Sequence, residues 1–325
     1  MRAPEFWNSG TLAAKTCAAL LSPCGALYGA SVRFRESRAR PYRARALVIC
    51  VGNLTAGGSG KTPVAIALGD RLAARGNIVF LSRGYGGRLE GPVIVDPLRH
   101  DARHVGDEPL LLARRHMTVV ARNRADGARL ADANGADCIV MDDGFQNFSV
   151  VKDFSLLVVD AENPFGNGKL IPAGPLREPV RSGLSRANAI ILTGSGDVAL
   201  PPFNGPILRA QFVPENLERM RGRKVMAFAG IGRPGKFFSM LSDYGVELTG
   251  ARAFPDHHMF TAGELVELKQ HAANSDALLV TTEKDFVRLD SSQRDGIEPV
   301  AIDAKFDGPL PESIFARLTE PAIAR

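Results

Sequence analysis

The chain has 325 residues, enough to bury a sizeable core or two modest α/β units. Its 45% hydrophobic and 23% charged residues are typical of an ordinary folded protein. The four cysteines form no C-x-x-C pair and no spacing that indicates a zinc site or a disulfide framework, so a reducing compartment is the simplest interpretation.

The positive charge is concentrated at the N-terminus. The net charge is +5, and residues 1–50 alone hold eight Lys or Arg against two Glu, a net +6, so the remainder is near −1. A basic protein would suggest a nucleic-acid partner, but here the excess belongs to one segment without interleaved aromatic side chains. We therefore expect no nucleic-acid binding.

The same N-terminal segment is apolar. Residues 12–32 are mostly Ala, Leu, Cys and Gly, interrupted by Pro23 and Gly25, and the run before Pro23 is shorter than the roughly 20 residues that span a bilayer. No basic stretch or cleavage site of a signal peptide is evident. An apolar helix followed by the basic residues 33–38 predicts an anchor at anionic headgroups. The alternative is a helix packed on its own domain with a solvated basic turn.

Apolar runs and helical patterns alternate along the rest of the chain. We expect strands at residues 46–51, 78–82, 117–121, 138–141, 156–160 and 188–193, and helices at 61–75, 109–116 and 124–134. This alternation predicts an α/β fold of the P-loop NTPase type, with a mostly parallel sheet flanked by helices.

A second, smaller α/β unit is expected after the Pro/Gly-rich residues 194–206. Its strands are predicted at 225–229, 277–281 and 299–302, and its helices at 236–244 and 262–273. The expected organisation is an N-terminal membrane-associating segment (1–45), a core (46–205), a linker (206–224) and the smaller domain (225–325).

A phosphate-binding loop is predicted between the first strand and the first long helix. Gly60, Lys61 and Thr62 match the end of the pattern G-x-x-x-x-G-K-[ST], although Thr55 stands at the first Gly position. The residues expected to cradle the phosphates are Thr55, Ala56, Gly57, Gly58, Ser59, Gly60, Lys61 and Thr62. Lys61 would bridge the β- and γ-phosphates, and the Thr62 hydroxyl would bind Mg²⁺. A chance Gly-Lys-Thr in a Gly-rich turn is the alternative, but the strand before and the helix after argue against it.

Two carboxylates end the strand predicted at 138–141. Asp142 and Asp143 lie where open α/β sheets bind ligands, beyond the carboxyl ends of the strands. One of them should reach Mg²⁺, which prefers oxygen ligands. The alternative is an Asp-Asp-Gly turn.

Three further motifs are open to two interpretations each. Asp107, with Glu108 after it, is either a helix cap or a carboxylate that orients an acceptor hydroxyl. His257 and His258 lack further ligands at metal-binding spacing, so a cap or turn role is the default. Residues 282–285, Thr-Glu-Lys-Asp, weakly resemble the base-reading N-K-x-D of GTPases.

Taken together and in order, these motifs resemble the tetraacyldisaccharide 4′-kinases, the lipid A 4′-kinases of Gram-negative bacteria. The matching segments are residues 51–63, 82–86, 106–109, 142–146, 163–179, 256–257 and 282–285. The resemblance implies an ATP- and Mg²⁺-dependent kinase that phosphorylates the 4′-hydroxyl of tetraacyldisaccharide 1-phosphate at the cytoplasmic face of the inner membrane. Thr55 in the loop is then a variant of this family.

The resemblance also implies roles for single residues. Asp107 would be the catalytic carboxylate, paired with His257 rather than His258, and Glu108 would position the base or water near the metal. Asp142 and Asp143 would serve Mg²⁺, and Arg124 would contact phosphate. The acceptor pocket would include Arg83, Tyr85 and Gln146, and the N-terminal segment would dock on the bilayer.

Two other classes of function are weighed. A P-loop GTPase or metal-cofactor maturation factor fits Lys61, Thr62 and Asp142, but leaves the apolar N-terminus and the Asp107–His257 pair unexplained. Strong GTP selectivity would favour it. A non-enzymatic, membrane-associated nucleotide sensor is the other alternative. The presence or absence of phosphoryl transfer distinguishes a kinase from such a sensor.

Overall fold

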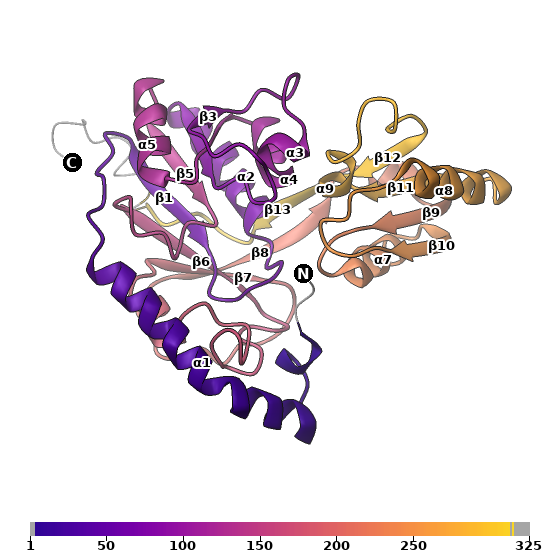
Figure 1. Cartoon of the computed structure of the whole chain (residues 1–325). Helices are drawn as coiled ribbons and strands as arrows, with labels where there is room; N and C mark the ends of the chain where they lie inside the picture. Colours follow the sequence, from indigo (N-terminus) through magenta and orange to yellow (C-terminus); the bar gives the residue numbers. More distant parts are fainter. Residues whose placement is uncertain (1–3, 313, 315–325) are drawn as a thin grey trace.

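The computed structural model describes residues 4–312 and 314, which form two lobes joined side by side (Figure 1). Residues 1–3 of the expected N-terminal segment, and residues 313 and 315–325 of the expected second domain, lie outside the described residues.

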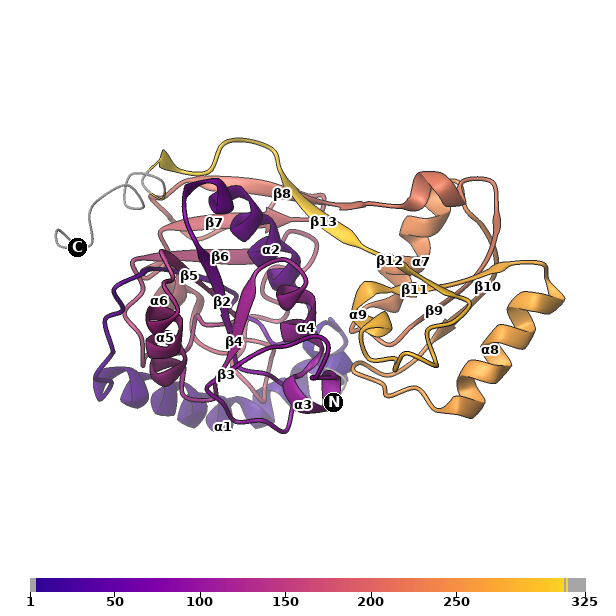
Figure 2. The same cartoon turned by 90° about the horizontal axis from the view of Figure 1, so that it is seen from above.

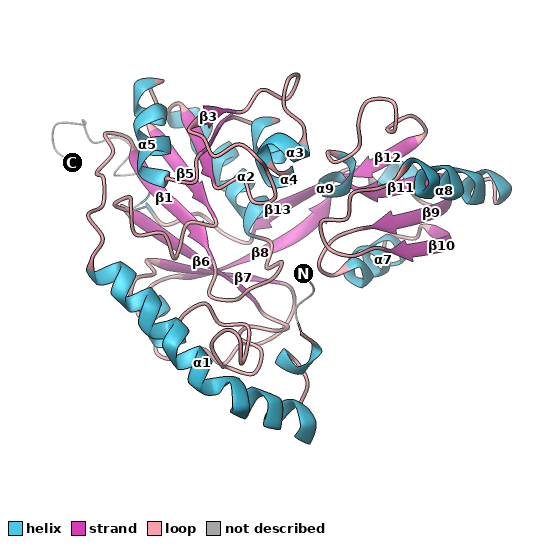
Figure 3. Cartoon of the chain, in the orientation of Figure 1, coloured by secondary structure: helices cyan, strands magenta, loops and turns pink. Residues whose placement is uncertain are grey.

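The large lobe is built on one sheet of mostly parallel strands (Figure 3). The strands, in spatial order, are β13 (Ile302–Phe306), β8 (Ile207–Pro214), β7 (Ala189–Thr193), β6 (Phe154–Asp160), β1 (Leu47–Gly52), β5 (Cys138–Asp142), β2 (Ile78–Ser82), β4 (Met117–Val120) and β3 (Val93–Ile94). Only β13 and β3, the two edge strands, pair antiparallel to their neighbours among the described residues.

Alternating side chains of β1 supply both cores of this lobe. Leu47 and Ile49 pack against α2 (Lys61–Leu72), whereas Val48 and Cys50 pack with α5 (Arg124–Ala133) on the other face. The remaining helical elements of the lobe are η1 (Glu5–Trp7), α1 (Leu12–Ser37), η2 (Ala73–Arg75), α3 (Ala102–Val105), α4 (Asp107–Ala113) and α6 (Val180–Leu184). A sheet buried on both faces explains why its strands are continuous apolar runs in the sequence.

Helix α1 runs along the outside of the large lobe (Figure 1). Its small residues Gly25 and Gly29 face inward, where a Cβ would lie 3.0 Å and 2.7 Å from atoms of Leu170. Helix α1 continues through Pro23, which lies on the exposed side of the helix. Within residues 4–312 and 314, no helix combines the length and the hydrophobicity needed to cross a bilayer.

The small lobe holds a separate parallel sheet. Its strands, in spatial order, are β10 (Glu247–Ala253), β9 (Lys224–Ala229), β11 (Leu278–Thr282) and β12 (Ile297–Val300). Helix α7 (Pro234–Asp243) packs on one face and α8 (Ala262–Asn274) on the other, and Figure 2 shows the sheet between them. The short helices η3 (Leu217–Met220) and α9 (Glu283–Phe286) complete the lobe.

The predicted α/β fold, with its smaller α/β unit and N-terminal helical segment, is confirmed. Sheet membership, however, divides the chain differently from the expected boundaries. The expected linker contains β8, and the chain returns from the small lobe to the large sheet as β13. Both strands lie at one edge of the sheet, and β8 is half-exposed, so neither forms the buried apolar run that marks the central strands.

Candidate active site

The predicted phosphate loop leaves β1 and enters α2. Gly60 has φ +78°, and a Cβ at this position would lie 2.1 Å from the Phe212 ring, so only glycine fits. Gly57 and Gly58 have the opposite surroundings: a Cβ on either would meet no atom of the described residues within 4 Å. The loop therefore surrounds open space at the N-terminus of a long helix, where backbone N–H groups favour an anion.

Neighbouring segments hold this loop in place. The Asn53 side-chain amide donates to Ser59 Oγ across the loop, at 2.8 Å. The Ala56 N–H donates to the Pro175 carbonyl at 2.8 Å, and the Arg177 N–H donates to the Leu54 carbonyl at 2.7 Å. These contacts come from the same lobe, so the loop is shaped before any ligand arrives.

Thr62 and Asp142 join the loop to the acidic strand end through a hydrogen bond. Thr62 Oγ1 donates to Asp142 Oδ2 at 2.9 Å, while Asp142 Oδ1 is buried and has no hydrogen-bond partner among the described residues. Burial, followed by the charges of Glu108 and Asp143, raises the pKa of Asp142 to about 7. A buried carboxylate oxygen without a partner beside a hydroxyl fits a cation, whose charge would favour the ionised form.

Asp143 has a different environment. Its Oδ1 lies 3.8 Å from Lys61 Nζ and accepts a hydrogen bond from Arg177 at 2.7 Å. Burial opposes its ionisation, but Lys61 and Arg177 outweigh burial and lower its pKa to about 2. Of the two predicted metal carboxylates, Asp142 has the free oxygen and Asp143 already pairs with cations.

The donor set suits a hard cation that keeps other ligands. The described residues contain no group of three or more His, Cys, Asp or Glu side chains that could hold a metal ion. Mg²⁺ in phosphoryl-transfer sites is bound by one or two protein oxygens, with phosphate and water completing its shell. Thr62 and Asp142 fit this pattern.

Arg124 lies near these carboxylates at the start of α5. Its side chain is buried, its Nη1 donates to the Ala121 carbonyl at 2.8 Å, and its Nε has no partner among the described residues. Burial, together with the charge of the nearby Arg83, lowers the pKa of Arg124 to about 10. Arg124 therefore stays charged at neutral pH and has one donor free for an anion.

The structure brings Asp107 and His257 together, although they belong to different lobes. Asp107 begins α4 after Gly106, whose φ is +90°, and its Oδ2 lies 2.9 Å from His257 Nδ1. The adjacent His258 instead contacts Glu264 at 3.0 Å and stacks on Phe254. The two histidines thus have separate partners, and only His257 contacts Asp107.

The other predicted residues lie in different environments. Tyr85 is exposed, with its ring centroid 5.6 Å from that of His257, and Arg83 is also exposed. Glu108 pairs with Lys284 of the small lobe at 3.0 Å.

Gln146 is half-buried, and its side chain donates to the Asn53 carbonyl and to Glu178, each at 2.9 Å. Gln146 therefore supports the phosphate loop in this structure.

Sequence reasoning assigned no role to several charged residues at this site. Arg177 contacts Asp143, Glu178 receives two hydrogen bonds from Arg186, and Arg288 contacts Asp107. Arg177 and Glu178 lie in the segment 163–179 that carried the resemblance, which was the available signal. Arg288 stands outside every motif, and no local pattern identifies it.

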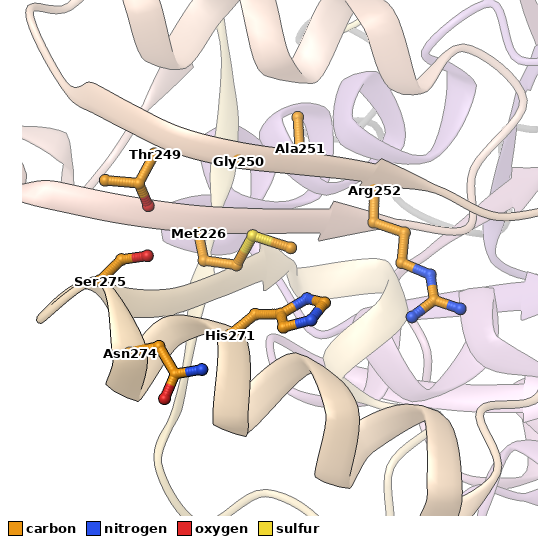
Figure 4. A pocket seen from close by; sticks show the side chains of 8 residues that line it. All are labelled: Met226, Thr249, Gly250, Ala251, Arg252, His271, Asn274 and Ser275. Atoms are coloured by element: carbon orange, nitrogen blue, oxygen red, sulfur yellow. The ribbon is translucent and has the colours of Figure 1, made fainter.

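A hollow of about 420 Å³ in the small lobe lies away from this site. It is lined by β9, β10 and α8, with Met226, Arg252 and His271 around it (Figure 4). None of the predicted site residues lines it.

The fold and this arrangement define a class, the P-loop proteins. In this chain a carboxylate of α4 and a histidine of the second lobe are held together beside the phosphate-binding side of the large lobe. Comparison with known proteins narrows the class. Residues 17–319 match the family described as LpxK, Tetraacyldisaccharide-1-P 4′-kinase. The chain belongs to this family.

Individual relatives agree with the family match. A Tetraacyldisaccharide 4′-kinase of Parvibaculum lavamentivorans is 52% identical over 306 residues, covering 89% of this chain and 87% of the relative. One of Rhodospirillum rubrum is 48% identical over 328 residues, covering 98% of each. A crystal structure of the "apo" form of LpxK from Aquifex aeolicus in complex with ATP matches with a TM-score of 0.72 and 27% identity, over 93% of this chain and 98% of that one.

The resemblance stated from the motifs is therefore confirmed, and so is the predicted enzyme class, a kinase acting on an alcohol group. The GTPase or maturation factor and the nucleotide sensor do not describe this family. The roles of single residues stay predictions.

Proposed function

We propose that this chain transfers the γ-phosphoryl group of ATP to the 4′-hydroxyl of tetraacyldisaccharide 1-phosphate, with Asp107 as the carboxylate that receives the hydroxyl. The observation that carries the proposal is the Asp107–His257 pair, held by two lobes in a chain of this family that also has an open phosphate loop. The family of the chain supports the acceptor, and the ATP complex of the Aquifex aeolicus relative supports the nucleotide.

Different residues act on the two reactants, and the residues of the phosphate loop and its neighbours act on ATP. The backbone of residues 55–60 would surround the phosphates, and Lys61 would bring its charge to the β- and γ-phosphates. Thr62 and Asp142 would hold Mg²⁺, which neutralises the charge developing on the phosphate oxygens. Arg124, with its unpartnered Nε, would face the same charge.

Asp107 acts on the other reactant. The acceptor hydroxyl donates a hydrogen bond to the carboxylate, and its oxygen forms a bond to the γ-phosphorus. The bond from that phosphorus to the β–γ bridging oxygen breaks, ADP leaves, and the hydroxyl proton passes to Asp107 as the new bond forms. His257 orients the carboxylate through the contact at 2.9 Å.

Helix α1 supplies the surface for a membrane-held acceptor. Leu12, Leu20 and Leu27 are 81%, 75% and 74% exposed, and with the exposed Phe34 they recur every seven or eight residues on one side of the helix. Basic residues follow at the end of the helix, where Arg38 lies over the Phe34 ring. We propose that α1 lies at the surface of the inner membrane, on the cytoplasmic side where ATP is available, as a peripheral or monotopic contact.

The experiment is label transfer from γ-labelled ATP, with Mg²⁺ and detergent-dispersed tetraacyldisaccharide 1-phosphate, resolved by thin-layer chromatography. The same lipid already phosphorylated at the 4′ position is the matched acceptor control. We expect label on the first lipid and none on the second. Label released only as inorganic phosphate, or transferred equally to both lipids, would overturn the proposal.

A further inference from the structure

The segment 281–285, which resembles a base-reading motif only weakly, has a different role in the structure. Thr282 caps α9, and its Oγ1 donates to Asp285 Oδ2 at 2.6 Å. The Gly230 N–H donates to the same oxygen at 3.1 Å, and the Asp285 side chain is fully buried. A carboxylate that is buried and supplied with donors cannot reach a nucleotide base.

Asp285 instead holds Arg288, one turn further along the chain. Arg288 Nη1 donates to Asp285 Oδ1 at 2.6 Å and to the Gly230 carbonyl at 2.8 Å. The Arg288 side chain is only 2% exposed. These contacts fix the guanidinium group within the small lobe.

The remaining edge of the guanidinium group faces Asp107 of the large lobe. Arg288 Nε donates to Asp107 Oδ2 at 2.8 Å, and Nη2 donates to the same oxygen. His257 Nδ1 also lies 2.9 Å from Oδ2. Among the described residues, Asp107 Oδ1 accepts only the Glu108 N–H, at 2.9 Å, so of the two oxygens Oδ1 keeps a lone pair for another donor.

We propose that Arg288, held by Asp285, is a positioning residue that directs Asp107 Oδ1 toward the acceptor hydroxyl. The inference rests on the proposed kinase function and assigns the Thr-Glu-Lys-Asp segment to the acceptor side of the site. Because three donors occupy Oδ2, Oδ1 is the one oxygen left for the substrate, and it is held in one orientation. The guanidinium fork suits this role because its planar geometry fixes a carboxylate in a way that an ammonium group does not.

The electrostatic environment agrees with this geometry. Burial opposes the ionisation of Asp107, but the charge of Lys284, the hydrogen bond from His257 and the charge of Arg288 outweigh burial and hold its pKa well below the usual range. Asp107 is then an orienting carboxylate in the ground state. It takes the hydroxyl proton only once the bond between the acceptor oxygen and phosphorus has begun to form, because that bond makes the proton far more acidic.

A neighbouring ion pair provides a matched control. Arg114 of the large lobe contacts Glu283 of α9 at 2.6 Å, so it also joins the two lobes. No hydrogen bond of Arg114 to Asp107 exists among the described residues. A substitution at Arg114 therefore removes an arginine contact between the lobes without disturbing the carboxylate.

The test compares Arg288→Gln, Arg288→Lys and Arg114→Gln with wild type in the lipid-labelling assay, measuring kcat and both KM values from about pH 5 to pH 9. For Arg288→Gln we expect kcat to fall about a hundredfold, the effect of misplacing a reacting group by roughly 1 Å, with both KM values within about threefold of wild type. Arg288→Lys should recover part of kcat, and Arg114→Gln should resemble wild type.

The pH profile separates positioning from general destabilisation. Asp107 is faced by Lys284 and Arg288 of the small lobe, by His257 and by Glu108 of its own helix. Loss of the Arg288 charge should move the acid limb of kcat to higher pH, whereas the limb of Arg114→Gln should not move. The proposal is overturned if Arg288→Gln retains wild-type kcat. It is also overturned if kcat of Arg288→Gln falls while the acid limb of its pH profile stays in place and Arg288→Lys recovers none of the lost kcat. Failure of the wild-type protein to label the lipid would instead overturn the proposed function.

Discussion

The phosphate loop and the surroundings of Asp107 differ in which lobe supplies their partners. The loop joins strand β1 to helix α2, and segments of the same lobe hold it through Asn53, Ala56 and Arg177. Asp107 receives its partners His257 and Arg288 from positions 150 and 181 residues away, in the other lobe. The phosphate loop is therefore held within the large lobe, whereas the contacts of Asp107 with His257 and Arg288 form where the lobes meet.

This difference predicts a separation of effects. Changes in the loop should alter the binding and activation of ATP, and changes in the contact between the lobes should alter transfer to the acceptor while ATP binding persists.

Among the changes to the phosphate loop, the largest effect is expected for Lys61→Ala. Loss of this ammonium group removes a charge aimed at the β- and γ-phosphates, and kcat should fall by about 10²- to 10³-fold. Steady-state labelling of the lipid measures it, with Lys305→Ala, an exposed lysine on β13, as the control. A Lys61→Ala enzyme with near-normal kcat would remove Lys61 from the phosphate site.

The two glycines of the loop should separate folding from binding. Gly58→Ala adds a methyl group where the described residues leave open space, so the melting temperature should hold while the Kd for ATP rises roughly tenfold. Gly60→Ala combines φ +78° with a contact of 2.1 Å to Phe212, and should lower the stability by about 1–3 kcal/mol. Calorimetric titration and thermal unfolding measure these changes. Unchanged ATP binding by Gly58→Ala would mean that phosphate does not occupy that space.

The pKa of Asp142 predicts how Mg²⁺ dependence varies with pH. Because burial and neighbouring carboxylates raise this pKa to about 7, the neutral form of Asp142 increases as the pH falls below that value. Mg²⁺ binds the ionised form, so the half-saturating Mg²⁺ concentration should rise by up to about tenfold per pH unit on the acid side.

Titrations of turnover with Mg²⁺ at about pH 6 and pH 8 measure this dependence. Asp142→Asn lacks the carboxylate and provides the baseline, since only the nucleotide then titrates. If wild type and this variant showed the same pH dependence, Asp142 would not be a ligand of the cation.

The smallest effect concerns α1. Leu27→Asp replaces an apolar side chain that is 74% exposed, so the fold should be unaffected, while binding to anionic phospholipid vesicles should weaken about tenfold. Leu98→Asp is the matched control, because Leu98 is 97% exposed and lies outside α1, between β3 and α3. Equal losses in a vesicle sedimentation assay would contradict a membrane contact specific to α1.

The parts of the fold that the sequence predicts well are the buried ones. β2 lies at residues 78–82 as expected, β1 is shifted by one residue at both ends and β5 is one residue longer, because a strand covered on both faces is an unbroken apolar run. β8 and β13 escaped prediction because they lie at a sheet edge and are only partly buried.

The site follows the same division. The loop and its Lys61 and Thr62 were predictable from spacing, since the motif itself lies within one strand–loop–helix unit. The pairing of Asp107 with His257 came from the family resemblance, because local patterns favoured a helix cap and a turn histidine. No sequence pattern identified Arg288. An arginine that is buried against a carboxylate 181 residues away has the same sequence appearance as a solvated arginine.

Single-turnover transfer by Asp107→Asn, with labelled ATP at saturating concentration, tests the separation of the two sides most directly. Asparagine keeps the size of the side chain but removes the charge that holds the acceptor. We predict that the transfer rate falls by about 10²- to 10⁴-fold while the Kd for ATP stays within about threefold of wild type. Transfer at the wild-type rate, or a loss of ATP binding that accounts for the slower transfer, would contradict an acceptor side built around Asp107 where the lobes meet.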